Sequence, residues 1–379
     1  MRRIYLDNAS TSWPKAPGIG EAMDQFLTLS GSNIGRGGYA ESYDAEEKVL
    51  ETREKVAELL GGDKSENVIF TLNATEAMNF AIKGLFTRED HLLVSSMEHN
   101  AVMRPLTEEG IPYTKIPSDK EGHLLLSKMD ALLTNKTKGI IVNAASNVSG
   151  TIQPIEEIAD YAMKHHLLFV IDGAQAIPHV PLNLSGLNAA AIIFAGHKGL
   201  LGPQGTGGLM LGEEAAGIIK PVISGGTGSM SDSLTMPQFF PDRLEAGTMN
   251  IPGIIALGVA LDYLKENEKR LKDNEHKRAE ELLEGFSMIP GIIIPDPNIG
   301  EKRTPVVSID IPAMDNADVA ATLAGKYGIE TRVGLHCAPE AHKALGTFPK
   351  GTIRFSPSGF TTKEETEETI KAIKEILHA

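Results

Sequence analysis

The sequence predicts an α/β protein, with a mostly parallel β-sheet in a large domain and a smaller α+β domain. Up to about residue 255, short runs rich in Val, Ile and Leu alternate with segments of helical period. This alternation is typical of repeated strand–helix units whose sheet is covered on both faces. A long charged segment then changes the pattern. We therefore expect a large domain over residues 18–255 and a small domain formed by residues 1–17 and 256–379.

The strands of the large domain are predicted from short apolar runs bounded by polar residues or glycine. Runs of this length, rich in β-branched side chains, are typical of strands that are buried on both faces. They lie at residues 67–72, 91–96, 112–117, 138–144, 167–172, 190–195 and 207–211.

Helices of the large domain are indicated by spacing and by capping residues. The helix from Tyr43 ends at Gly61-Gly62, where a glycine C-cap belongs, and places four apolar side chains on one face: Val49, Val56, Leu59 and Leu60. A second helix is expected from Ala74 to Phe86, with Asn73 or Thr75 as its N-cap. A third is expected to open at Pro154 and to run to about His165.

The small domain follows a long helix that is expected to connect it to the large one. This helix, Leu257 to Phe286, has a Lys/Glu-rich face that we expect in water. The elements predicted after it are the strands Val306–Ile311, Ile329–Val333 and Thr352–Ser356 and the helix Ala317–Tyr327. The last helix is predicted to begin with a capping box at Thr361–Glu364.

Composition and charge exclude several classes of protein. The 379 residues carry a formal net charge of -14, which argues against a nucleic-acid partner. No apolar run approaches the roughly 20 residues that span a bilayer, and the N-terminal residues turn polar too soon for a signal peptide. We expect a cytoplasmic protein with no membrane partner. The single cysteine, Cys337, excludes an internal disulfide.

Two residues at predicted strand ends suggest a cofactor site. Lys198 follows a strand through Gly196-His197, and Asp172 ends another before Gly173. Ligands of α/β sheets gather at the carboxyl ends of strands. Taken singly, a surface lysine and a turn-forming aspartate would explain these residues. Together they suit pyridoxal 5'-phosphate (PLP), whose aldehyde is carried by a lysine as a Schiff base while a carboxylate keeps the ring nitrogen protonated.

Two further strand ends offer groups for such a cofactor. Ala74 and Thr75 begin a helix, where backbone N–H groups and the helix dipole attract a phosphate. Plain helix capping is the alternative there. His99 follows the strand at 91–96, and a neutral imidazole can stack on a flat ring and move protons. A solvated or capping histidine is the alternative at this position.

The segment Arg332–Pro339 is predicted to display the only thiol. A strand runs out through Gly334 into His336 and Cys337, and proline follows, which describes a surface loop. A nearby cation or His336 could make Cys337 a reactive nucleophile. Arg354, in an apolar and hydroxylic strand, suits bidentate binding of a substrate carboxylate, although a solvent-facing edge arginine is the alternative. No metal-ligand spacing is found, and we expect no metal.

The motifs occur in an order that resembles a known family. They are Tyr5–Thr11, Ala74–Ala77, Glu98–Asn100, Ser146–Gly150, Asp172–Gln175, Gly196–Lys198, Glu245–Thr248 and Arg332–Cys337. The chain resembles, end to end, the cysteine desulfurase and selenocysteine lyase branch of the class V aminotransferase-fold PLP enzymes, in the group with a short cysteine loop. This resemblance implies the fold-type I architecture of PLP-dependent transferases.

The resemblance also implies a role for each site residue. Lys198 would bind PLP covalently, Asp172 would pair with the ring nitrogen, His99 would stack on the ring, and Gln175 would bond the ring hydroxyl. The phosphate would be held by the turn of Ala74 and Thr75, by His197, and by Thr248 of a second subunit. Asn147, Arg332 and Arg354 would bind the amino acid substrate. Lys198, His99 and Cys337 would be catalytic.

The activity that this resemblance implies is conversion of L-cysteine to L-alanine, with the sulfur taken by Cys337 as a persulfide. A homodimer and an acceptor protein for sulfur or selenium are expected with it. The alternatives are a selenocysteine lyase, or an aminotransferase, epimerase or β-lyase in which Cys337 is incidental, or a non-catalytic PLP-binding or sulfur-relay partner. One position departs from the family: Ala195 stands where a serine hydroxyl usually contacts the phosphate.

Overall fold

A computed structural model describes residues 2–35, 37–298 and 303–378. Within these residues a seven-stranded sheet has the order β2-β8-β7-β6-β5-β3-β4. Its strands are β2 (Val68–Thr71), β3 (His91–Ser95), β4 (Tyr113–Ile116), β5 (Thr137–Asn143), β6 (Leu168–Asp172), β7 (Ala191–Ala195) and β8 (Gly207–Leu211). β8 is antiparallel to both neighbours, and the other neighbouring strands are parallel. The predicted mostly parallel sheet is confirmed.

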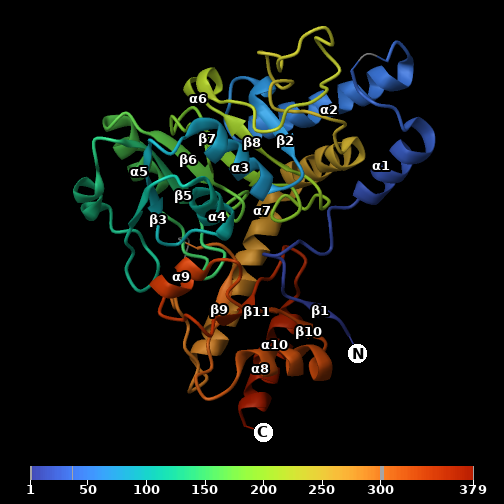
Figure 1. Ribbon diagram of the computed structural model, residues 1–379. Helices are drawn as coiled ribbons and strands as arrows, with labels where there is room; N and C mark the ends of the chain where they lie inside the picture. The colour runs from blue at the N-terminus through green and yellow to red at the C-terminus, as the bar shows by residue number, and fades with distance from the viewer. Residues whose placement is uncertain (1, 36, 299–302, 379) are drawn as a thin grey trace.

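Helices cover both faces of this sheet (Figure 1). One face packs against α3 (Ala74–Leu85), α4 (Asn100–Glu109) and α6 (Glu213–Ile218), and the other against α1 (Ile19–Gln25), α2 (Ala40–Leu59), α5 (Ile155–Lys164) and the first part of α7 (Ile251–Ser287). In β6, for example, Phe169 packs on the α2 side and Val170 on the α3 side. Burial on both faces explains why the inner strands are apolar runs, whereas the edge strand β4 is partly buried and contains Thr114 and Lys115.

The predicted helices of this region form with small shifts. α2 begins at Ala40 and buries Val49, Val56 and Leu60, but Leu59 is 37% exposed, so its assignment to the apolar face was wrong. Leu59 lies about 100° around the helix from Leu60, which turns it toward solvent. Asn73 is the N-cap of α3, and its side chain accepts a hydrogen bond from the Glu76 backbone N–H.

Short 3-10 and π turns complete the connections in and around these elements. They are η1 (Phe26–Ser30), η2 (Ser65–Asn67), η3 (Leu126–Leu132) and η4 (Leu323–Tyr327).

The C-terminal part of the chain forms a second, smaller core. β9 (Val307–Ile309), β12 (Thr352–Phe355) and β11 (Arg332–Gly334) form an antiparallel sheet, and β1 (Ile4–Tyr5) pairs in parallel with β10 (Ile329–Glu330). α8 (Asn316–Thr322) and α10 (Lys363–Leu377) contribute to this core. α9 (Pro339–Ala344) instead packs Ala341 in a separate cluster with Met97 and Val148. The strand predicted at 329–333 is divided at Thr331, because its two halves pair with different strands.

The capping box of the last helix lies one residue later than predicted. Thr361 forms a turn with Ser358, whose backbone N–H donates to the Thr361 hydroxyl at 2.9 Å. Thr362 is therefore the N-cap of α10, and Glu365 completes the box. The spacing of the motif is as expected, but the preceding turn takes the first threonine.

α7 connects the two cores. It spans 37 residues, and Asn250 caps its start by accepting from the Gly253 N–H. The residues from Ile251 to Leu271 pack into the core of the large sheet, whereas Ala279 to Phe286 pack against the small one. Figure 1 shows this helix running from one region to the other. No helix among the described residues is both long and apolar enough to span a bilayer.

A buried ion pair fixes the edge of the large sheet. Nη1 and Nη2 of Arg53, on α2, donate to the Glu245 carboxylate, at 2.8 and 2.9 Å. The Phe70 N–H of β2 also donates to this carboxylate at 2.7 Å, and Arg53 lies over the Phe70 ring. The pair therefore ties the segment that precedes Gly247-Thr248 to the sheet.

Replacing Glu245 by Ala is expected to lower the free energy of unfolding by about 3–5 kcal/mol, because Arg53 is left as an uncompensated buried charge. Urea unfolding measures this. Glu58→Ala is the control: its partner Lys265 is exposed, so the loss should stay within about 1 kcal/mol. Equal losses for the two variants would contradict the importance of the buried pair.

Candidate active site

A cavity of about 210 Å³ lies at the carboxyl ends of β5, β6 and β7. Parallel strands bring their ends to one edge of the sheet, so residues distant in sequence meet there. The cavity is lined by these predicted site residues: Ala74, Thr75, His99, Asn147, Asp172, Gln175, His197, Lys198, Arg332 and Arg354.

Lys198 enters the cavity from the tight turn after β7. Gly196 begins this turn, and a Cβ there would lie 2.2 Å from the Thr206 hydroxyl oxygen, so only glycine fits. Burial lowers the pKa of the Lys198 amine to about 8, and Arg354 and Arg332 act in the same direction, while Asp172 opposes them. Part of the amine is therefore uncharged at neutral pH, as a nucleophile requires.

Asp172 lies opposite, at the end of β6. Its Oδ1 accepts from the Ala174 N–H at 3.0 Å. Burial raises the pKa of this carboxyl, against the effects of that hydrogen bond and of Lys198. Gln175, in the turn that follows, donates from Nε2 to the Ala9 carbonyl at 2.8 Å. A carboxylate and an amine thus face one cavity from adjacent strands.

His99 is the N-cap of α4 and also lines the cavity. Its Nδ1 accepts from the Ala101 N–H at 3.0 Å, so a neutral ring carries its proton on Nε2. Burial lowers the pKa of His99 to about 4, and Lys198 and Arg332 reinforce the shift. The imidazole is therefore neutral at physiological pH and can stack on a flat ring.

The other end of the cavity offers donors to an anion. The first residues of α3, with Thr75, lie there. His197 Nδ1 is buried and has no hydrogen-bond partner among the described residues. Burial, with Lys198 and Lys15, lowers the pKa of His197 to about 4. Ala195 also lines the cavity and, being alanine, adds no hydroxyl to these donors.

A buried acid, Glu98, lies beneath this surface. Its Oε1 is 2.5 Å from the Ser95 hydroxyl and accepts from the Asn143 N–H at 2.8 Å. The Ser95 hydroxyl also lies 3.0 Å from Asn143 Oδ1, so its one proton cannot serve both oxygens. Burial raises the pKa of Glu98 to about 8, and the charge of Asp172 adds to this. Glu98 is therefore protonated at neutral pH.

Two arginines close the side of the cavity. Arg354, 1% exposed, donates to the Asn147 carbonyl at 3.0 Å and forms a 2.9 Å ion pair with Asp7. Arg332 donates to the Ser10 hydroxyl at 2.9 Å and lies 3.5 Å from the Cys337 sulfur. Arg354 is therefore a buried residue of the cavity wall and not a solvent-facing edge arginine.

Cys337 is exposed and lies next to this cavity, in a loop with a fixed backbone. His336 and Cys337 both have positive φ angles, of 48° and 59°. The His336 carbonyl accepts from Asn147 Nδ2 at 2.7 Å, the Cys337 carbonyl accepts from the Asn100 N–H at 2.8 Å, and the buried His336 ring contacts the Thr352 hydroxyl at 3.0 Å. The displayed thiol agrees with the sequence prediction.

Thr248, which was predicted to contact the phosphate from a second subunit, lies away from the cavity. It is exposed and does not line the cavity of its own chain.

The sequence predicts no role for Ser10 or Glu98, although they lie in the motifs Tyr5–Thr11 and Glu98–Asn100. His336 was predicted as a possible activator of Cys337, and the structure directs its ring to the Thr352 hydroxyl instead. Ser10 bonds Arg354, 344 residues away, and no local pattern marks such a contact. The hydroxylic run Ser10-Thr11-Ser12 before Trp13 is the one local signal for Ser10.

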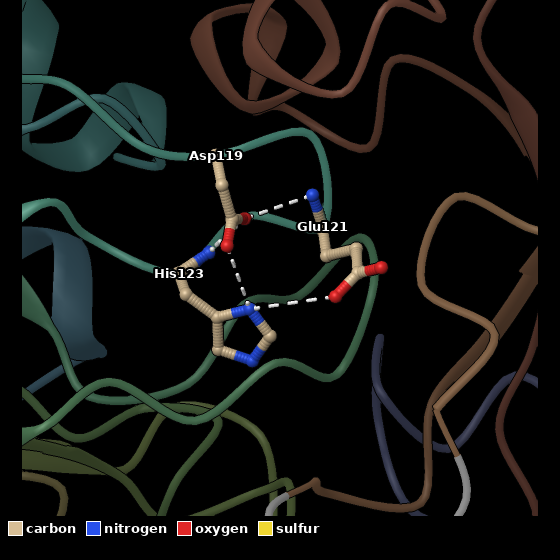
Figure 2. Close-up of side chains that lie close together, drawn as sticks. All are labelled: Asp119, Glu121 and His123. Atoms are coloured by element: carbon tan, nitrogen blue, oxygen red, sulfur yellow. Dashed lines mark hydrogen bonds and ion pairs between the residues drawn. The ribbon is translucent and has the colours of Figure 1, made fainter.

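Another group of polar side chains occurs in the turn after β4. Figure 2 shows Asp119, Glu121 and His123, whose possible ligand atoms lie within 4.8 Å of one another. Asp119 Oδ1 accepts from the backbone N–H groups of Glu121 and His123, both at 2.9 Å. Hydrogen bonds within the turn thus account for this grouping, which is not part of the cavity lining.

Comparison with known proteins identifies the family. Residues 4–368 match the family described as aminotransferase class-V. The chain therefore belongs to the class-V aminotransferase family.

Its relatives narrow this assignment. A probable cysteine desulfurase of Methanothermobacter thermautotrophicus is 34% identical over 98% of this chain and 94% of its own length. A probable cysteine desulfurase of Vibrio cholerae is 31% identical over 98% and 92%. The apo structure of a cysteine desulfurase from Thermococcus onnurineus is 32% identical, with a TM-score of 0.91, over 99% of this chain and 95% of that one. These likenesses confirm the cysteine desulfurase branch inferred from the motifs.

Glu98→Gln is expected to change how stability depends on pH. Between the usual pKa near 4.5 and the folded value near 8, the folded chain keeps a proton that the unfolded chain loses, so stability falls as pH rises through this range. Relative to the variant, the wild type should lose up to about 1.4 kcal/mol per pH unit.

Urea unfolding at pH 5.5, 6.5 and 7.5 would measure this difference. The control is Glu214→Gln, an exposed position, which should run parallel to the wild type. A parallel Glu98→Gln curve would mean that Glu98 is not protonated in the folded state.

Proposed function

We propose that the protein is a PLP-dependent cysteine desulfurase that converts L-cysteine to L-alanine and takes the sulfur on Cys337 as a persulfide. One observation carries the proposal: Arg332 contacts the exposed Cys337 sulfur and also lines the cavity that holds Lys198 and Asp172. The names of the relatives support the same reaction.

The residues of the cavity fit PLP. Lys198 can bind the aldehyde, Asp172 can pair with a protonated ring nitrogen, and neutral His99 can stack on the ring. The unpartnered His197 Nδ1, Thr75 and the start of α3 can hold the phosphate. When bound, PLP supplies an electron sink for the negative charge that develops on the substrate carbon.

Lys198 and Asp172 have different roles in proton transfer at the substrate Cα. The lowered pKa of Lys198 lets its amine take a proton from the substrate Cα and return it. Asp172 keeps the ring nitrogen protonated, because a carboxylate beside a pyridine favours the charged form of the ring. Glu98, being neutral, leaves Asp172 as the negative charge nearest to the ring.

The two arginines and Asn147 provide a place for the substrate carboxylate. Arg354 Nε is buried and lacks a partner within the described chain, so one donor is available to a ligand. Arg332 is half-buried on the side of Cys337. A carboxylate bound there places the substrate sulfur toward the thiol.

Cys337 then takes the sulfur. Its thiolate forms a bond to the substrate sulfur while the bond between that sulfur and Cβ breaks. The electron pair of the broken bond stays with carbon, and protonation of this carbon gives alanine. The products balance as alanine and a Cys337 persulfide, with no external oxidant or reductant.

A homodimer completes the phosphate site in this proposal. Thr248 is exposed, while the adjoining Glu245 is held to the sheet by Arg53, so the Thr248 loop is presented outward. Large apolar side chains are exposed nearby in sequence: Ile223, Met230, Leu234 and Phe239. A second copy would cover these side chains and receive Thr248.

PLP uptake by the apoprotein is expected to speed up with rising pH, with a midpoint near 8. The reason is that only the uncharged Lys198 amine attacks the aldehyde. Absorption at several pH values gives the rate, and borohydride reduction with peptide mapping gives the lysine. Lys198→Ala should abolish the label, and exposed Lys220→Ala should keep it. A label on another lysine in the wild type would refute the assignment.

Cys337→Ala is expected to reduce alanine formation from cysteine by roughly 10³-fold or more, as for the loss of other covalent nucleophiles. The absorption of bound PLP should stay unchanged, because Cys337 does not line the cavity. Alanine and sulfide measured together give the result, with Cys337→Ser as a matched variant. Full activity of both variants would favour another class V reaction in which Cys337 is incidental.

A further inference from the structure

The hydroxyl of Ser10 joins the two arginines of the cavity. Ser10 Oγ accepts from Arg332 Nη1 at 2.9 Å and from Arg354 Nη2 at 2.8 Å. It donates to Asp7 Oδ1 at 2.7 Å. Because its one proton goes to Asp7, both of its lone pairs face guanidinium groups.

This arrangement reduces the repulsion between the two positively charged arginines. Two guanidinium groups held close together repel each other, and Arg354 is 1% exposed, so water screens it poorly. Asp7 pairs with Arg354 and neutralises one of the two charges. The cluster keeps one net positive charge beside the cavity, which suits a singly charged carboxylate.

The two arginines differ in how firmly they are held. Arg354 is also fixed by Asp7 and by the Asn147 carbonyl. Arg332 has two side-chain contacts among the described residues, one to Ser10 and one to the Cys337 sulfur. Ser10 is therefore the link that holds Arg332 at a fixed distance from the buried Arg354.

We propose that Ser10 is a positioning residue that sets the spacing of Arg332 and Arg354 for the α-carboxylate of the amino acid substrate. This inference rests on the proposed function, since it names the residue that tunes the substrate site. Without the hydroxyl, Arg354 stays in place and Arg332 is released. The affinity for ligands that carry a carboxylate then decreases.

The test compares two amines bound by the PLP-loaded protein. L-Alanine carries the carboxylate, whereas ethylamine has the same amine and carbon chain without it. Both are titrated against wild type and Ser10→Ala while the absorption of the cofactor is followed. Ser10→Ala should weaken L-alanine binding about 10-fold or more, the worth of one charge-assisted hydrogen bond, and leave ethylamine unchanged.

A matched pair of variants guards against a folding defect. Ser10→Thr and Ser10→Val have the same shape and differ by the hydroxyl, so Thr should bind L-alanine more tightly than Val by a similar factor. Equal weakening of both amines, or no change for either, would overturn the positioning role. A wild type that responds to neither amine would instead overturn the proposed function.

Discussion

The site depends on the burial of one cation, Arg354. A guanidinium that is 1% exposed must find its hydrogen bonds inside the protein, because leaving it unpaired would cost several kcal/mol. Arg354 obtains them from the N-terminal segment through Asp7 and from the loop after β5 through the Asn147 carbonyl. It lies on β12, in the small core. One side chain therefore brings three distant parts of the chain to the same cavity, and β1, the loop after β5 and the small sheet all take their places around it.

Much of the fold could be predicted because the strands of the large sheet are buried on both faces. All but the edge strand β4, which contains Thr114 and Lys115 and is partly buried, read as apolar runs with a polar or glycine end. The observed strands agree with the predicted ranges to within one residue at each end. Sequence patterns do not indicate which strands pair with each other or in which direction. The strand predicted at 329–333 is divided at Thr331 because its two halves pair with different strands. β8 runs antiparallel to β7, which its apolar sequence does not indicate. Leu59 and the shifted capping box show that sequence patterns can also misplace a feature by one residue.

The candidate site divides in a similar way. Lys198, Asp172 and His99 could be found because each follows a strand, and strand ends of a parallel sheet share one edge. Ser10 and Glu98 could not, because their roles come from contacts that only the folded chain creates. For Ser10 these are guanidinium groups 322 and 344 residues away, and for Glu98 they include the neighbouring strand through Asn143. Both residues lie within motifs of the sequence, but the partners that give them their roles are defined only by packing.

The backbone around Cys337 has a consequence for where its sulfur can travel. Two successive residues in the left-handed region cost on the order of 1 kcal/mol each, and hydrogen bonds from Asn147 and Asn100 hold them there. In this structure these contacts hold the loop backbone against the large domain. Sulfur carried on this residue would stay at the rim of the cavity, and delivery would require the recipient to come to the rim and present its own nucleophile within bonding distance.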